Sequence, residues 1–186
     1  EVIGAAHPVP DESGLTAAKR LKTILSGLSA CDLVIALVCG GGSALLPSPP
    51  DGFTLADEIG LNEVLLASGA PISAMNVVRK HFSTIKGGRL AAATKARVVT
   101  FVVSDIPGDT AALVSSGPTI PDDSSRQEAL DIIARYRMEL PSKLLDFLST
   151  PAADAPCPKS AAFEGNTWHV LSSARVALDA AAEFAQ

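Results

Sequence analysis

Short apolar runs alternate along the chain with longer stretches whose apolar residues recur at helical spacing. The runs Leu33–Cys39 and 98–103 are continuous, which is typical of parallel strands buried on both faces. Shorter runs at 1–5 and Thr167–Ser172 predict two further strands. The pattern therefore predicts four strands, each followed by a segment long enough for a helix.

Local signals place the helices between these strands. Ser73 is positioned to cap a helix that runs to Lys86 and stops at two glycines. Ser125 and Glu128 have the spacing of a capping box. The expected helices cover 13–28, 55–67, 73–86, 125–137, a short stretch from 141, and 174–185. Such βαβ units predict an α/β fold: a Rossmann-like, largely parallel sheet with helices on both faces, an α/β/α sandwich.

In such a sheet, ligands bind where the strands end, so the loops after Cys39 and Val103 are the first places to look. The first of these loops reads Gly40-Gly41-Gly42-Ser43. Without Cβ atoms its backbone N–H groups could close around an anion, and Ser43 adds a hydroxyl. The loop has neither a Walker A lysine nor the dinucleotide-binding glycine pattern. A plain tight turn is the alternative.

Charge is unevenly distributed in this acidic chain, whose net charge is −5. No Asp or Glu occurs between Glu63 and Asp105, whereas six basic residues do: Arg79, Lys80, Lys86, Arg89, Lys95 and Arg97. On the helix expected at 73–86, one face would carry Asn76, Arg79, Ser83 and Lys86. This face is expected to turn toward a small anion, although a merely solvated basic face is the alternative. The acidic net charge and the lack of interleaved aromatic residues argue against nucleic acid.

The loop after Val103 carries Ser104, Asp105 and Asp109. A carboxylate at a strand end can accept a substrate proton or hold a metal ion, and a structural turn is the alternative. Asp105 is the better candidate because Asp109 follows a Pro-Gly turn, and the basic block is expected to surround Asp105. Ser116 and Gly117, further along, offer a hydroxyl and an open backbone approach.

The histidines and cysteines carry weaker signals. His7 is expected to be structural or solvated, His81 to lie beside the basic face, and His169 to be buried in the core. The three cysteines include no Cys-x-x-Cys pair, and Cys31 and Cys39 would be about 26 Å apart along a strand. Reduced thiols, no export signal and no apolar run of membrane-spanning length lead us to expect a cytoplasmic protein.

Six ordered motifs resemble the N-terminal domain of the glycerate 2-kinase family, whose members have a C-terminal MOFRL domain and often carry the name hydroxypyruvate reductase. The motifs are HPVPD at 7–11, GGGSALL at 40–46, MNVVRKH at 75–81, KGGRL at 86–90, SDIPGD at 104–109 and SGPT at 116–119. The resemblance spans essentially the whole chain. It implies ATP-dependent, Mg²⁺-assisted phosphoryl transfer to the 2-hydroxyl of D-glycerate, with glycerate and a nucleotide as the partners.

The resemblance also implies what a complete member would add. The family's upstream lysine motif and the MOFRL domain have no match here, so the chain is expected to be an N-terminal domain that is incomplete at its start. Asp105, Arg79 and Lys86 are the expected catalytic residues, with Asp105 also a candidate Mg²⁺ ligand. Substrate or phosphate binding is expected from Gly40, Gly41, Gly42, Ser43, Asn76, Arg79, Lys80, Ser104, Asp109, Ser116 and Gly117. Hydroxypyruvate reduction and anion binding without catalysis are the alternative functions, and the oligomeric state, a homodimer included, stays open.

Overall fold

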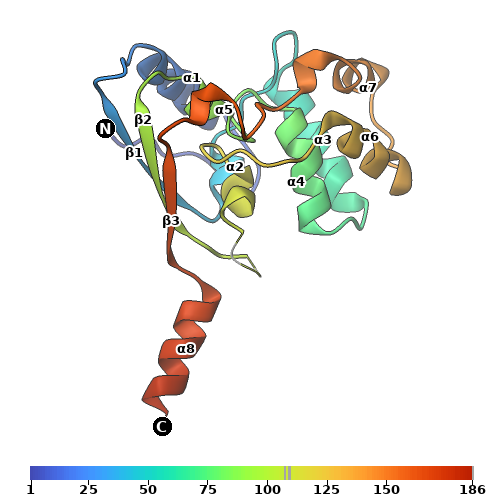
Figure 1. Ribbon diagram of the computed structural model, residues 1–186. Coiled ribbons are helices and arrows are strands. Elements are labelled where there is room, and N and C mark those ends of the chain that lie inside the picture. The colour runs from blue at the N-terminus through green and yellow to red at the C-terminus, as the bar shows by residue number, and fades with distance from the viewer. Residues whose placement is uncertain (107, 109, 186) are drawn as a thin grey trace.

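A three-stranded parallel sheet organises the computed structural model, which describes residues 1–185 except 107 and 109 (Figure 1). Its strands are β1 (Leu33–Cys39), β2 (Arg97–Val103) and β3 (Thr167–Ser172), in that spatial order. β1 and β2 pair without a register shift from Leu33 opposite Arg97 to Cys39 opposite Val103. The loops that follow these two strands therefore start side by side at the carboxyl edge of the sheet.

The prediction of a fourth strand at 1–5 is wrong. These residues form no strand; they approach the first helix, where the carboxylate of Glu1 pairs with Arg20 at 2.6 Å. The parallel sheet and the α/β class are confirmed.

The described residues also form eight α-helices and three short 3₁₀ segments, which precede, connect and follow the strands. They are α1 (Glu12–Ser26), α2 (Gly42–Leu45), α3 (Leu55–Ala67), α4 (Ile72–His81), α5 (Arg89–Ala92), α6 (Arg126–Arg135), α7 (Ser142–Leu148), α8 (Ala174–Phe184), η1 (Ala111–Ser116), η2 (Pro151–Ala153) and η3 (Ala161–Phe163). Ser125 caps α6 as predicted, by accepting the backbone N–H of Glu128 at 3.1 Å.

α4 differs from its prediction at both ends. Its N-cap is Pro71 rather than Ser73, and it ends at His81 rather than Lys86. Phe82 leaves the helical conformation, and the Ser83 hydroxyl then accepts the N–H groups of Ile85 and Lys86, each at 3.2 Å. A serine that bonds its own following backbone favours a turn over a continuing helix, which explains the early end.

Two groups of helices pack differently around the sheet. α3, α4, α6 and α7 form a helical lobe with its own apolar core, in which Phe53, Phe82 and Phe147 meet edge to face (Figure 1). α1 and α5 pack against one face of the sheet through Ala18, Leu25 and Leu90. No helix in the described residues is long and apolar enough to cross a membrane.

The prediction of helices on both faces does not hold for the described residues. On the face of β1 turned away from α1 and α5, the side chains of Leu33, Ile35 and Leu37 are 59%, 60% and 79% exposed. α8, the helix after β3, projects away from the sheet and buries none of its residues (Figure 1). The described residues therefore cover one face only.

Candidate active site

The glycine loop, residues 40–43, connects β1 to α2 at the carboxyl edge of the sheet. A Cβ at Gly40 would collide with the carboxylate of Asp105, and one at Gly42 would lie 2.6 Å from Oγ of Ser115. Gly41 has a φ of +82°, a backbone conformation that residues with a side chain rarely adopt. Among the described residues, no acceptor pairs with the backbone N–H groups of Gly41, Gly42 or Ser43. The loops after β1 and β2, the two places to look for a ligand site, thus lie against each other, and only glycine at position 40 lets Asp105 come this close.

Residues 115–117 have left-handed backbone conformations and lie against the glycine loop. Ser115, Ser116 and Gly117 have φ values of +51°, +60° and +59°, which costs the two serines about 1–2 kcal/mol each. The carbonyls of Ser116 and Gly117 accept the N–H groups of Gly87 and Gly88 at 3.0 and 2.7 Å. A Cβ at Gly117 would lie 2.5 Å from a backbone carbonyl oxygen, so Gly117 is packed closely and offers no open approach, contrary to expectation.

Hydrogen bonds connect this stretch to α4. The Ser43 and Ser116 hydroxyls lie 3.0 Å apart, and that of Ser116, which is buried, donates to Oδ1 of Asn76 at 3.2 Å. Asn76 Oδ1 also accepts Nη1 of Arg79 at 3.2 Å. The network thus brings together four residues that the sequence predicts at the site, although they lie far apart along the chain.

Arg79 is the basic residue of this network that forms no ion pair in the described residues. Its Nε donates to Oδ1 of Asn62 at 2.8 Å, so both of its partners are neutral amides. Burial lowers the pKa of the guanidinium, and the negative charge of Glu58 opposes that shift.

The two lysines predicted beside Arg79 form ion pairs with carboxylates inside the fold. Lys86 pairs with Glu58 at 2.7 Å, with both side chains almost completely buried. Lys80 is fully buried and pairs with Asp122. The prediction that the positive charge of these lysines faces a ligand is therefore corrected: each meets a carboxylate from outside the acid-free stretch of the sequence.

The rest of the basic block also lies elsewhere. Arg89 joins α5 to the segment at 153–154, because its Nη2 donates to the carbonyls of Ala153 and Asp154 at 2.8 and 2.9 Å. Burial lowers the pKa of Arg89 to about 10. Arg97 begins β2 and Lys95 precedes it, at the end of the strand opposite to Asp105. The basic block does not surround Asp105 as expected.

Asp105 is exposed at the carboxyl edge and lies against Gly40. No cation in the described residues lies within ion-pair distance of it. Ser104 beside it is buried, and its N–H donates to the carbonyl of Ser172 at 2.8 Å, so Ser104 joins the loop to β3. Asp109 lies outside the described residues.

The carboxyl edge of the sheet offers Mg²⁺ a single protein carboxylate, that of Asp105, rather than a full set of ligands. No group of three or more His, Cys, Asp or Glu side chains in the described part of the chain could form a complete metal cage. Mg²⁺ is commonly held by one or two carboxylates together with substrate phosphates and water. Asp105 fits that arrangement as a single protein ligand.

One of the three histidines, His169, is placed against expectation. His7 is exposed, but its Nε2 lies 3.4 Å from where a Cβ on Gly41 would stand. His81 is buried, with Nδ1 2.8 Å from the carbonyl oxygen of Ala153. His169 is exposed and stacks on Phe101, so the prediction that it belongs to the core is wrong. All three cysteines are free and exposed.

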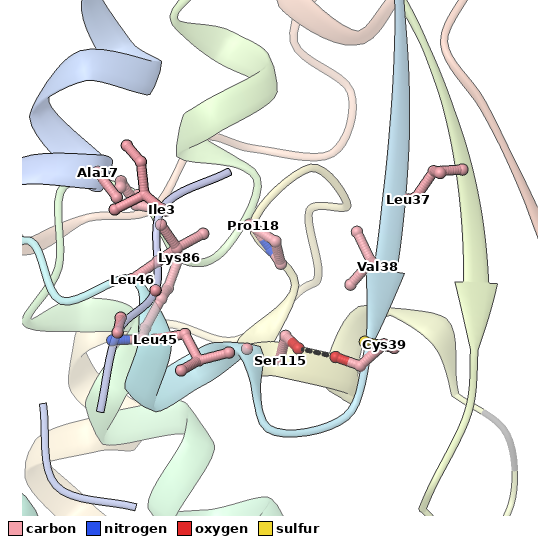
Figure 2. A pocket seen from close by; sticks show the side chains of 14 residues that line it. Ile3, Ala17, Leu37, Val38, Cys39, Leu45, Leu46, Lys86, Ser115 and Pro118 are labelled. Atoms are coloured by element: carbon pink, nitrogen blue, oxygen red, sulfur yellow. Dashed lines mark hydrogen bonds between the residues drawn. The ribbon is translucent and has the colours of Figure 1, made fainter. Parts of the chain in front are cut away.

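Two cavities flank the glycine loop. An apolar hollow of about 450 Å³ lies between β1 and residues 3–5, lined mainly by aliphatic side chains such as Ile3, Val38 and Leu46 (Figure 2). Ser115 stands at this hollow and bonds to the carbonyl of Cys39 (Figure 2). A polar pocket of about 190 Å³ is lined by residues that include His7, Gly41, Ser43, Asn62 and Arg79.

Two residues of this arrangement escaped the sequence analysis. Glu58 gives a usable signal, because it occupies the buried face of α3 together with Leu55, Leu61 and Leu65. A carboxylate in an apolar stripe indicates a buried ion pair. Asn62 gives no such signal, since it is one polar residue on a helix and its role depends on the packing of α3 against α4.

The fold and site define a class: a parallel α/β protein with backbone N–H, hydroxyl and guanidinium donors gathered where its strands end. A family described as "Domain of unknown function (DUF4147)" matches residues 1–149. The chain belongs to this family.

Its relatives carry two kinds of name. A protein of Agrobacterium vitis, named as a hydroxypyruvate reductase, is 48% identical over 99% of this chain and 47% of its own length. The D-glycerate 2-kinase of Thermotoga maritima is 41% identical over 75% of this chain and 34% of its own length. The crystal structure of the T. maritima glycerate kinase matches with a TM-score of 0.82 and 34% identity, over 94% of this chain and 41% of that one. The chain thus spans less than half the length of these relatives, and the resemblance to the glycerate 2-kinase family is confirmed.

Proposed function

We propose that this chain is the N-terminal part of a glycerate 2-kinase, which transfers the γ-phosphoryl group of ATP to the 2-hydroxyl of D-glycerate. One observation carries the proposal: the glycine loop, Asp105 and Arg79 come together at the carboxyl edge of a parallel sheet. Phosphoryl transfer needs charge stabilisation and positioning more than covalent chemistry from the protein. These three features supply N–H donors, a carboxylate and a cation.

The proposed reaction forms a bond between the 2-hydroxyl oxygen and the γ-phosphorus. The bond from that phosphorus to the β–γ bridging oxygen breaks, and ADP leaves. The hydroxyl proton passes to Asp105, or to solvent if Asp105 holds the metal instead. Mg²⁺, when bound at Asp105, would neutralise charge on the phosphates. The N–H groups of Gly41, Gly42 and Ser43 bind a phosphate or a carboxylate of the ligands.

The test is a product assay on the full-length parent protein. With ATP, Mg²⁺ and D-glycerate, we expect ADP release and equimolar 2-phosphoglycerate, identified by ³¹P NMR against the 3-phosphate isomer. Omitting D-glycerate should abolish ADP release.

Hydroxypyruvate reduction is the second candidate, because the relatives that are 48% and 45% identical carry that name. Hydride transfer needs a nicotinamide site, and the loop after β1 lacks the dinucleotide-binding glycine pattern. Oxidation of NADH by hydroxypyruvate, with no phosphorylation of D-glycerate, would replace the kinase by the reductase.

A further inference from the structure

The polar pocket has the character of an anion site. Its lining includes Arg79, the Ser43 hydroxyl and the exposed imidazole of His7, and contains no Asp or Glu. On one side it is bounded by Gly41, whose N–H group has no acceptor among the described residues. The polar groups of this lining are therefore mostly donors, set among proline, alanine and leucine side chains.

Arg79 brings an uncompensated positive charge to it. Its Nε and Nη1 donate to the amide oxygens of Asn62 and Asn76, and no carboxylate of the described residues lies within ion-pair distance. Glu58 acts on it electrostatically, but the carboxylate of Glu58 already binds Lys86 at 2.7 Å and the N–H of Ser48 at 2.9 Å. Arg79, Lys86 and Glu58 together leave one positive charge.

Size separates the candidate ligands. Pockets for drug-sized ligands span about 300–1,000 Å³, so a cavity of about 190 Å³ is too small for a nucleotide. A three-carbon acid is small enough for it. The planar fork of a guanidinium matches the two oxygens of a carboxylate.

We infer that the polar pocket is the subsite for the carboxylate of the hydroxy-acid substrate, and that Asn62 is the residue that positions Arg79 for it. This inference rests on the proposed function for the identity of the acid. The phosphoryl group then approaches from Asp105, which lies against Gly40 of the same loop.

Asn62 is itself held in place. Its Nδ2 donates to the carbonyl of Glu58, one turn back on α3, at 2.9 Å. That bond fixes which end of the amide faces Arg79, so Oδ1 accepts from Nε. Asn62→Ala frees one edge of the guanidinium, whereas Asn62→Asp places a carboxylate against it and cancels its charge.

The experiment measures D-glycerate binding and turnover in the full-length parent protein. Calorimetry without nucleotide gives the Kd for D-glycerate, for inorganic phosphate and for glycerol, which lacks the carboxylate. We expect D-glycerate to bind and glycerol not to bind. Asn62→Asp should weaken D-glycerate binding at least 100-fold and Asn62→Ala about tenfold. Both variants should raise the KM for D-glycerate while leaving the KM for ATP within twofold. Glu63→Gln, an exposed neighbour on α3, is the matched control.

The outcomes separate this inference from the proposed function. Binding that Asn62→Asp removes, in a protein without kinase activity, keeps the carboxylate subsite and overturns the kinase. Kinase activity in which Asn62→Asp raises the KM for ATP instead overturns the subsite and keeps the kinase. Binding of inorganic phosphate alone, lost in Asn62→Asp, makes the pocket a phosphate site and also overturns the inference. An Asn62→Asp protein that fails to fold transfers the decision to Asn62→Ala.

Discussion

The charged side chains around the glycine loop fall into two groups that the sequence does not distinguish. Lys80 and Lys86 are buried and bind Asp122 and Glu58, so their charge is cancelled where they stand. Arg79 is held by two amides and Asp105 has no ionic partner in the described residues, so no ion pair there compensates either charge. The comparison shows that a count of basic residues does not locate an anion site. The partner of each residue does.

The largest effect is expected at Asp105. Asp105→Asn keeps the shape and removes the charge, so turnover of the full-length parent should fall about 10²–10⁴-fold, the usual contribution of a proton-transferring group. The exposed side chain predicts little change in unfolding free energy. Steady-state kinetics with urea denaturation measure both quantities. If Asp109→Asn has this effect and Asp105→Asn is mild, the two aspartates exchange roles.

Glu58→Gln tests the group whose charge is cancelled. It leaves Lys86 buried without its counter-ion, which should cost about 3–5 kcal/mol of unfolding free energy. Replacing both residues, with Glu58→Leu and Lys86→Met, should recover most of that loss. Glu63→Gln on the exposed side of α3 is the control. A Glu58→Gln protein of unchanged stability but abolished turnover would return Lys86 to the catalytic residues, as the sequence alone suggests.

How far sequence reasoning reaches is clear from these same residues. Local patterns locate β1, β2 and β3 because short apolar runs between helix-length segments are typical of parallel strands, although β1 is exposed on one face and β3 is mostly exposed. Ser125 caps α6 as its spacing to Glu128 predicts, because an N-cap depends only on neighbouring residues, although the reciprocal bond of a full capping box is not formed. The edge-of-sheet rule correctly brings the glycine loop to Asp105. These features depend on neighbours in the chain or on one topological rule.

The remaining features depend on contacts between distant segments. The pairing of Lys86 with Glu58 joins residues that are 28 positions apart, and that of Lys80 with Asp122 joins residues 42 apart. No local pattern indicates such pairs, so the acid-free stretch looks like a single basic surface. The same holds for Asn62, whose contact with Arg79 exists only because α3 and α4 pack together.

Arg79→Ala sharpens the comparison from the other side. If Arg79 makes a charge-assisted bond to the substrate, kcat/KM for D-glycerate should fall roughly 30–150-fold. This corresponds to an increase of about 2–3 kcal/mol in activation free energy. Stability should change much less than in Glu58→Gln, because Arg79 has no buried counter-ion to orphan. Arg97→Ala, at the far end of β2, controls for loss of a positive charge. An unchanged kcat/KM would reduce Arg79 to a structural cation like Lys86.

The smallest effect is expected in the pH dependence of stability, and it comes from His81. Burial lowers its pKa below the ordinary value of 6.5, partly opposed by its hydrogen bond to Ala153. Below pH 6.5 the unfolded chain therefore takes up a proton that the folded protein does not, so stability is lost as the pH falls. The slope of unfolding free energy against pH should reach at most about 1.4 kcal/mol per pH unit between 6.5 and the lowered folded pKa.

Urea unfolding of wild type and His81→Gln from pH 7.5 to 5 should show this extra slope in wild type alone. His169→Gln, which changes an exposed histidine, should keep the wild-type slope. Equal slopes in wild type and His81→Gln would mean that the buried imidazole takes up its proton as readily as in the unfolded chain.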